Sequence, residues 1–209
     1  MSGHISAVIF DFGGVLVTSP FTAMRAWARS NGHDAGAVME IFLGPYHDDG
    51  DHPFHRAERG ELTAAEFRPM IQLLADEQGI DISTARGVAS MQPVPEMIER
   101  VRELRRDGYR TALLSNTIRE FGGLWRTLVP IDDLFDVVVE SAEVGMRKPN
   151  PSIYRLTLER LGDPPAESVV FLDDHPGNIA GAIGVGLRTV LVGDDPAPAL
   201  AELNRLLAT

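Results

Sequence analysis

The chain has 209 residues, of which 44% are hydrophobic and 23% are charged, and it contains no cysteine. This length and composition predict a globular protein with one sizeable core, or with one core and a smaller appended unit. The lack of cysteine excludes a disulfide framework, a thiolate nucleophile and a zinc site built on sulfur.

The charge balance limits the partners of the protein. Its 19 basic and 30 acidic residues give a net charge of -11, which disfavours nucleic acid and anionic membranes as partners. No apolar stretch approaches the roughly 20 residues of a membrane helix, and residues 1–6 lack the basic cluster of a signal peptide. We therefore expect a cytoplasmic protein that binds neither membrane nor nucleic acid; the sequence leaves its oligomeric state open.

The first predicted strand covers residues 7–10, an apolar run that ends in a lone carboxylate, Asp11. Two glycines, Gly13 and Gly14, follow almost at once. Glycines in such a place indicate a sharp turn and a backbone that comes close to another group. A carboxylate beside such a turn is a candidate functional residue.

Residues 18–93 form an insert after the first predicted strand, because they contain helical periodicity and loops but no convincing buried strand. Helices are expected over 21–29, 36–42, 63–76 and 83–91. Prolines near both ends, at Pro20 and at Pro93, discourage helix continuation and mark the expected limits of this insert.

After residue 93, apolar strand patterns alternate with helical ones. Strands are expected over 111–114, 137–139, 168–172 and 188–192, and helices over 95–107, 152–161, 178–183 and 197–207. Uninterrupted apolar runs are typical of strands that are covered on both faces. The alternation predicts an α/β fold, with a doubly wound parallel sheet and an inserted all-helical domain.

Polar residues follow the predicted strands where ligands collect in open parallel sheets, at their carboxyl ends. Asp11 follows the first strand, the run from Ser115 to Thr117 follows the second, and Asp173 and Asp174 follow the fourth. The loop after the third strand contains Lys148. Each alone is more typical of a turn, a helix cap or a solvated lysine. Together they supply a nucleophile, hydrogen-bond donors, a cation and an acidic pair, which fits phosphoryl transfer.

Four strings carrying these residues, VIFDFGGVL, LLSNT, GMRKPNPSIY and VFLDDHPGNIAGA, resemble the ordered motifs of the haloacid dehalogenase (HAD) superfamily. The resemblance implies a HAD-like Rossmannoid core domain over 1–17 and 94–209, with a helical cap domain of the first type over 18–93. With ERGELTAAEF, the chain is most similar to bacterial sugar-1-phosphate (glucose-1-phosphate) phosphatases and to the phosphatase domain of soluble epoxide hydrolase.

The resemblance implies a phosphate-handling role for four residues. Asp11 would be the nucleophile that attacks phosphorus and becomes an aspartyl-phosphate. Ser115 and Asn116 would hydrogen-bond the phosphoryl oxygens. Lys148 would hold the nucleophile and the transferring group together by charge.

The resemblance also implies a Mg²⁺ site. Its ligands would be Asp11, the backbone carbonyl of Gly13 and Asp174, a set of hard oxygen donors that magnesium prefers. Asp173 would orient Lys148 or a metal-bound water. Asn178 stands where relatives often carry a supporting acid.

Gly13 departs from the pattern of the family. Most of its phosphatases carry a second aspartate at this position, which protonates the leaving alcohol, and general acid–base catalysis contributes about 10²- to 10⁴-fold. We therefore expect slow turnover or a substrate with a good leaving group, such as an anomeric phosphate. His175, His52 and His55 are candidates for a substitute acid.

The expected function is Mg²⁺-dependent hydrolysis of a small phosphorylated metabolite, with a sugar 1-phosphate as one candidate. A metal-free dehalogenase, which also lacks the second aspartate, and a catalytically weak phosphate-binding protein are the alternatives. In the insert, His52, His55, Arg56 and Arg59 are candidates for contacts with the substrate.

Overall fold

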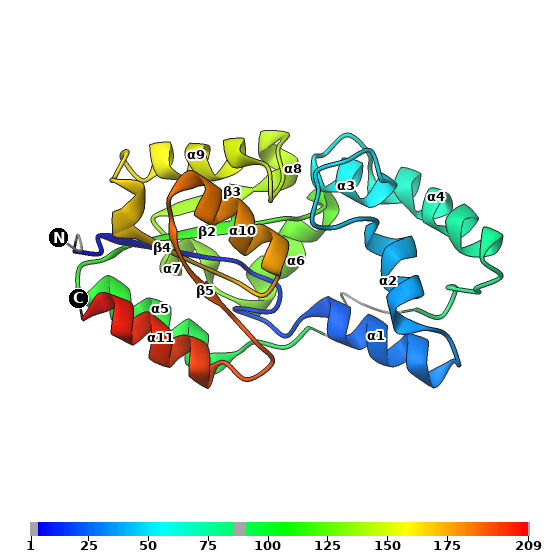
Figure 1. The fold of residues 1–209 in the computed structure, drawn as a ribbon, viewed down its shortest axis with the longest axis horizontal. Helices are drawn as coiled ribbons and strands as arrows, with labels where there is room; N and C mark the ends of the chain where they lie inside the picture. The colour runs from blue at the N-terminus through cyan, green and yellow to red at the C-terminus, as the bar shows by residue number, and fades with distance from the viewer. Residues whose placement is uncertain (1–3, 86–90, 209) are drawn as a thin grey trace.

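A computed structural model describes residues 4–85 and 91–208. Its centre is a five-stranded parallel sheet in the order β3-β2-β1-β4-β5 (Figure 1). The strands are β1 (Ala7–Phe10), β2 (Arg110–Ser115), β3 (Val137–Glu140), β4 (Val169–Asp173) and β5 (Arg188–Leu191). All five predicted strands are confirmed within one residue at each end, because their continuous apolar runs are buried from both sides.

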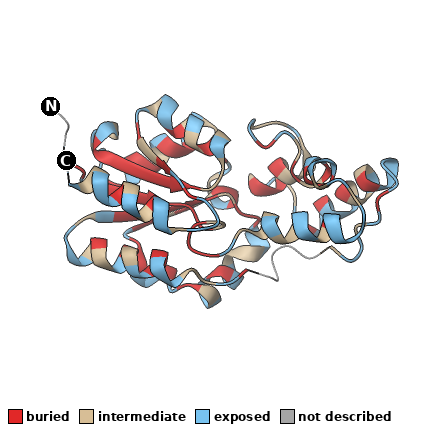
Figure 2. Ribbon diagram, turned by 60° about the horizontal axis from the view of Figure 1, so that its bottom comes forward, coloured by how far each residue is buried: buried red, intermediate tan, exposed pale blue. Residues whose placement is uncertain are grey.

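Helices cover both faces of the sheet, and alternate residues of each strand point to opposite faces. Val8 and Phe10 of β1 belong to the apolar cluster formed with α5 (Pro95–Arg106) and α11 (Ala197–Leu207). Ala7 and Ile9 belong to the cluster on the other face, with α9 (Pro151–Arg160) and α10 (Pro176–Val185). The buried strands between half-buried helices are visible in Figure 2. The doubly wound parallel sheet is therefore confirmed.

Several short elements were not predicted, because segments of three to seven residues do not show a helical period. They are η2 (Arg119–Phe121), α6 (Gly122–Leu128), α7 (Ile131–Leu134), α8 (Ser141–Val144) and η3 (Ala166–Ser168). Trp125, Ile131 and Leu134 of α6 and α7 are buried in the same cluster as α5. These elements complete one face of the core.

The insert consists of α1 (Pro20–Ser30), α2 (Ala35–Leu43), α3 (Pro53–Glu58) and α4 (Ala64–Glu77). They lie beyond the end of the sheet where β1 ends (Figure 1). An apolar cluster of their own includes Val38, Phe67 and Ile71. Three of the predicted helices are confirmed, and α3 was missed. Most of the helix expected over 83–91 lies outside the described residues, and Ser83 and Thr84 form a turn.

The arginines on and next to α5 are paired with acidic residues of the helix or with Asp136. Each of the five arginines between residues 100 and 110 forms an ion pair with a nearby glutamate or aspartate. This is the solvated face typical of a surface helix. Within residues 4–85 and 91–208, no helix is both long enough and apolar enough to cross a lipid bilayer.

Candidate active site

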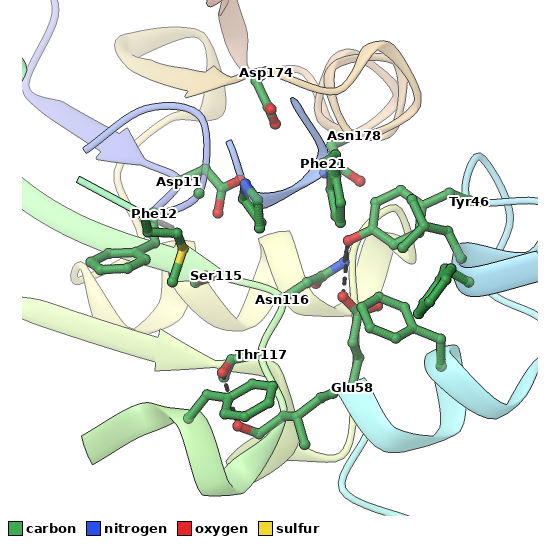
Figure 3. Close-up of a pocket in the computed structure, with 18 of the residues that line it drawn as sticks. Asp11, Phe12, Phe21, Tyr46, Glu58, Ser115, Asn116, Thr117, Asp174 and Asn178 are labelled. Atoms are coloured by element: carbon green, nitrogen blue, oxygen red, sulfur yellow. Dashed lines mark hydrogen bonds between the residues drawn. The ribbon is translucent and has the colours of Figure 1, made fainter. Parts of the chain in front are cut away.

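The predicted site residues meet at the carboxyl end of the sheet, where the strand order changes direction. β1 lies between β2 and β4, so Asp11 lies between the ends of both neighbours. In Figure 3 the carboxylates of Asp11 and Asp174 lie on one side of a pocket, near Ser115. Gly13, Asn116 and Asn178 also line this pocket, whereas Lys148 and Asp173 lie buried behind it.

Lys148 is the only lysine of the chain, and its side chain is fully buried. The ammonium Nζ donates to Asp11 Oδ1 at 2.8 Å, to Asp173 Oδ2 at 2.6 Å and to the carbonyl oxygen of Leu114 at 3.0 Å. These contacts use all three of its donors. Burial acts to lower the pKa of Lys148, but the carboxylates of Asp11 and Asp173 outweigh it and raise that pKa. The side chain is therefore a fixed cation against the predicted nucleophile.

Asp173 is held in place from two further directions. Its Oδ1 accepts hydrogen bonds from the backbone N–H of His175 at 2.8 Å and from Asn178 Nδ2 at 3.0 Å. The buried Asn178 Oδ1 has no hydrogen-bond partner among the described residues. This geometry favours the predicted role of Asp173 as the residue that orients Lys148, with Asn178 behind it.

Asn116 binds the loop that carries Lys148. Its Oδ1 accepts from the backbone N–H of Lys148 at 2.8 Å, and its Nδ2 donates to the carbonyl oxygen of the same residue at 3.0 Å. The amide thus satisfies both backbone groups of Lys148. The sequence did not indicate this contact, which makes Asn116 a positioning residue as well as a candidate phosphate ligand.

The charges of the site fit a divalent cation. Carboxylate oxygens of Asp11, Asp173 and Asp174 lie within 4.8 Å of one another. With Lys148 as their one lysine partner, three carboxylates leave an excess of two negative charges. Burial, together with repulsion among these carboxylates, raises the pKa of Asp11 and of Asp174. Because Asp173 is committed to Lys148, the residues that fit Mg²⁺ are Asp11, Asp174 and the Gly13 carbonyl.

Gly13 and Gly14 differ in whether the structure could hold a side chain at their position. Gly14 has a φ of +77°, and a Cβ there would lie 2.1 Å from Asp174 Oδ2, so its missing side chain makes room for that carboxylate. Gly13 does not adopt a left-handed conformation. A Cβ at Gly13 would meet Pro20 Cδ at 3.4 Å, an ordinary contact. The backbone therefore accepts a side chain at residue 13 but not at residue 14.

A buried polar network joins the insert to the core, and the sequence analysis missed it. Arg147, fully buried, donates from Nε to Glu58 Oε2 at 2.8 Å and from Nη1 to the carbonyl oxygen of Asp48 at 2.6 Å. The Tyr46 hydroxyl donates to Glu58 Oε1 at 2.9 Å. It also accepts from Asn116 Nδ2 at 3.4 Å (Figure 3). The network thus connects α3 with the residue that precedes Lys148.

The three histidines considered as substitute acids do not line the pocket. Burial lowers the pKa of His52 and His175, and lowers that of His55 to about 4. Burial therefore favours the neutral form of all three rings. The His175 ring packs edge-on against the Tyr46 ring, with the ring centroids 4.9 Å apart. Their position outside the pocket lining and the lowered pKa values both disfavour these histidines as the substitute acid.

The two arginines expected to contact substrate point elsewhere. Arg59 forms ion pairs of 2.6 Å with both Asp49 and Glu61, and Arg56 pairs with Glu61 at 3.2 Å. Neither lines the pocket. α3 instead presents Phe54 and Glu58 to it, because residues four apart lie on the same face of a helix.

Comparison with known proteins agrees with this arrangement. The family described as haloacid dehalogenase-like hydrolase matches residues 5–186. Acyl-CoA dehydrogenase family member 10 from Mus musculus is 35% identical over 210 residues, which cover 96% of this chain and 19% of that protein. Bifunctional epoxide hydrolase 2 from Rattus norvegicus is also 35% identical, over 96% of this chain and 38% of its own length. The chain thus spans well under half of these two relatives.

A solved structure also bears on the metal. A HAD family enzyme from Bacteroides thetaiotaomicron, in complex with magnesium and inorganic phosphate, superposes with a TM-score of 0.63 at 26% identity, over 91% of this chain and 96% of that one. Further relatives are named as phosphatases. The expected Mg²⁺ cofactor agrees with the magnesium in that structure. Since the family match covers most of the chain and its motif residues meet at one edge of the sheet, this protein is a haloacid dehalogenase-like hydrolase.

Proposed function

We propose that the protein is a Mg²⁺-dependent phosphomonoesterase that acts on a small phosphorylated metabolite through an aspartyl-phosphate at Asp11. The observation that carries the proposal is the bridge that Lys148 makes between Asp11 and Asp173, beside the carboxylate of Asp174, for which the described residues provide no ion-pair partner. A nucleophilic carboxylate held by one ammonium, with room for a divalent cation, suits a dianionic phosphate. Relatives named as phosphatases support the same reaction.

The reaction has two displacements at phosphorus. In the first, a carboxylate oxygen of Asp11 forms a bond to phosphorus while the ester P–O bond breaks, and the leaving oxygen takes up a proton. In the second, water attacks the phosphorus of the aspartyl-phosphate, which releases inorganic phosphate and restores Asp11. Lys148 and the Ser115 hydroxyl balance the negative charge of the transferring group. Mg²⁺, when bound by Asp11, Asp174 and the Gly13 carbonyl, neutralises further charge.

The charge excess also separates this proposal from a dehalogenase. In a dehalogenase the leaving group is a halide on carbon, and the substrate carries no phosphate dianion. That reaction therefore needs no second cation to neutralise the charge of the substrate. Here Asp174 is a second pocket carboxylate beside Asp11 with no lysine partner of its own. Halide release from a 2-haloacid in the absence of metal, without phosphatase activity, would favour the dehalogenase instead.

Removal of the metal tests the proposal directly. We expect phosphate release from p-nitrophenyl phosphate to fall about 100-fold after exhaustive EDTA treatment and to return when Mg²⁺ is added back. Ca²⁺ should inhibit, because its larger and looser coordination shell displaces the nucleophile. Full activity in the chelated protein, with metal content verified by elemental analysis, would contradict the proposed function.

The glycine at position 13 predicts that the rate of hydrolysis depends unusually strongly on the basicity of the leaving group. Without a carboxyl at this position, kcat/KM should fall steeply from p-nitrophenyl phosphate to a primary alkyl phosphate. Gly13→Asp should raise kcat/KM for the alkyl ester about 100-fold and change that for p-nitrophenyl phosphate little.

Gly13→Ala is the matched control for that substitution, since it adds the same Cβ, which the backbone accepts, without a carboxyl. This variant should show the same fall in kcat/KM from p-nitrophenyl phosphate to the alkyl ester as the unmodified protein. A flat dependence in the unmodified protein would show that another group donates the proton.

A further inference from the structure

The pocket in front of Asp11 continues from the sheet edge into the insert, and its walls change from polar to apolar in that direction. Near the sheet it is lined by carboxylate, hydroxyl and amide groups. The insert contributes apolar side chains from three helices, namely Phe21, Met24, Phe42, Leu43 and Phe54. The sheet end and the insert end of the pocket therefore differ in polarity.

The core adds further apolar groups to the pocket. Ile118, Phe121 and Trp125, which follow β2, line the same space. Phe12, next to the nucleophile, stacks on the Trp125 ring with centroids 4.5 Å apart. An apolar wall thus begins directly beside Asp11.

The polar groups that the insert offers are already bonded to protein. Glu58 accepts from Arg147 and from the Tyr46 hydroxyl. Among the described residues that line the pocket there is no lysine, arginine or histidine. The insert therefore presents no cation and few free polar atoms to the part of the substrate that leaves. Sugar hydroxyls placed there would lose their hydrogen bonds to water without replacement, whereas methylene groups would gain from burial.

Resting on the proposed phosphatase function, we infer that the substrate is the phosphomonoester of an apolar alcohol, such as an alkyl, prenyl or aryl alcohol, rather than a sugar phosphate. Asp11 and its neighbours bind the phosphate, and the walls built by α1, α2 and α3 bind the hydrocarbon. The insert selects the substrate by shape and apolar contact.

A series of primary n-alkyl phosphates from ethyl to octyl tests this inference. All members have nearly the same leaving-group basicity, so chain length isolates contact with the apolar walls. We expect kcat/KM to rise about threefold to fourfold with each methylene until the pocket is full. Hexyl phosphate and glucose 6-phosphate form a matched pair, because both release a six-carbon primary alcohol. Hexyl phosphate should be preferred at least 100-fold.

Two variants of the insert test whether the dependence on chain length arises from contacts with the apolar wall of the pocket. Met24→Gln puts a polar group of similar length into the wall and should lower the ratio of kcat/KM for octyl phosphate to that for ethyl phosphate about tenfold. Leu73→Gln is the matched control: Leu73 lies on α4, is 63% exposed and does not line the pocket. It should leave the ratio unchanged. Thermal unfolding of both variants checks that each is folded.

The outcomes separate this inference from the proposed function. Phosphate release with no chain-length dependence, or a preference for glucose 6-phosphate over hexyl phosphate, overturns the apolar substrate class and leaves the phosphatase intact. No release from any ester, p-nitrophenyl phosphate included, overturns the proposed function, and this inference with it.

Discussion

Asp11→Asn abolishes phosphate release from p-nitrophenyl phosphate, with an expected loss of at least 10⁴-fold in kcat. An amide cannot form the bond to phosphorus that starts the reaction, and no neighbouring group replaces it: Asp173 is held by Lys148 and Asn178. Stability should be kept or should increase. Asparagine fills the same volume, and it removes one charge from a cluster whose burial already raises the pKa of Asp11.

The experiment compares kcat with the free energy of unfolding in urea. Asp133→Asn serves as the control, because Asp133 is exposed at the start of α7, away from the pocket. It should change neither quantity. Acid-quenched wild-type protein should carry radiolabel from a phosphorus-32 ester, and the Asp11→Asn variant should not. Turnover of the variant above one per cent, with its mass verified, would remove Asp11 from the mechanism.

The residues at the strand ends could be predicted because each depends on local sequence. A continuous apolar run of four or five residues identifies a buried strand, and the residue after it must reach the carboxyl edge of the sheet. That rule identifies Asp11, Ser115 and Asp174 as candidates, and it places Lys148 in the loop after the third strand. The roles of all four came from the resemblance to a family. The network of bonds around Lys148 is visible only in three dimensions.

The surroundings of the substrate could not be predicted, because they depend on contacts between distant segments. Glu58 and Arg147 both stand in the motif strings quoted above, but they are 89 residues apart in the chain. Their contact could therefore not be inferred from either string. α3 has six residues, too few for a periodic pattern to show which side is buried. The sequence therefore suggested charged residues in α3 and directly after it, Arg56 and Arg59, as substrate contacts. The structure instead places Phe54 and Glu58 at the pocket.

The network between Glu58 and Arg147 also links the insert to the loop that carries Lys148. Arg147 precedes Lys148, and the amide of Asn116 binds both backbone groups of Lys148 while lying 3.4 Å from the Tyr46 hydroxyl. The insert therefore contacts the loop that carries the ammonium.

Lys148 is the second residue whose loss we expect to stop the reaction. Removal of its ammonium leaves Asp11 and Asp173 facing each other without a cation and leaves the dianionic substrate unattracted. We expect Lys148→Cys to lower kcat on p-nitrophenyl phosphate about 10³-fold. The variant should also be less stable, since breaking a buried ion pair costs about 3 to 5 kcal/mol. Urea unfolding in the presence of Mg²⁺ measures that cost separately from the loss of activity.

The composition of the chain allows the charge to be restored chemically. Because the protein contains no cysteine, the new thiol is the only one present, and 2-bromoethylamine applied in denaturant converts it to an aminoethyl thioether of nearly the length of lysine. After refolding with Mg²⁺, activity should return to within about tenfold of wild type. Alkylation with 2-bromoethanol gives a neutral side chain of the same length, and the protein refolded with Mg²⁺ after this treatment should not regain turnover. Equal recovery with both reagents would mean that Lys148 fills space rather than supplying charge, and the ammonium bridge between Asp11 and Asp173 would then have no part in phosphoryl transfer.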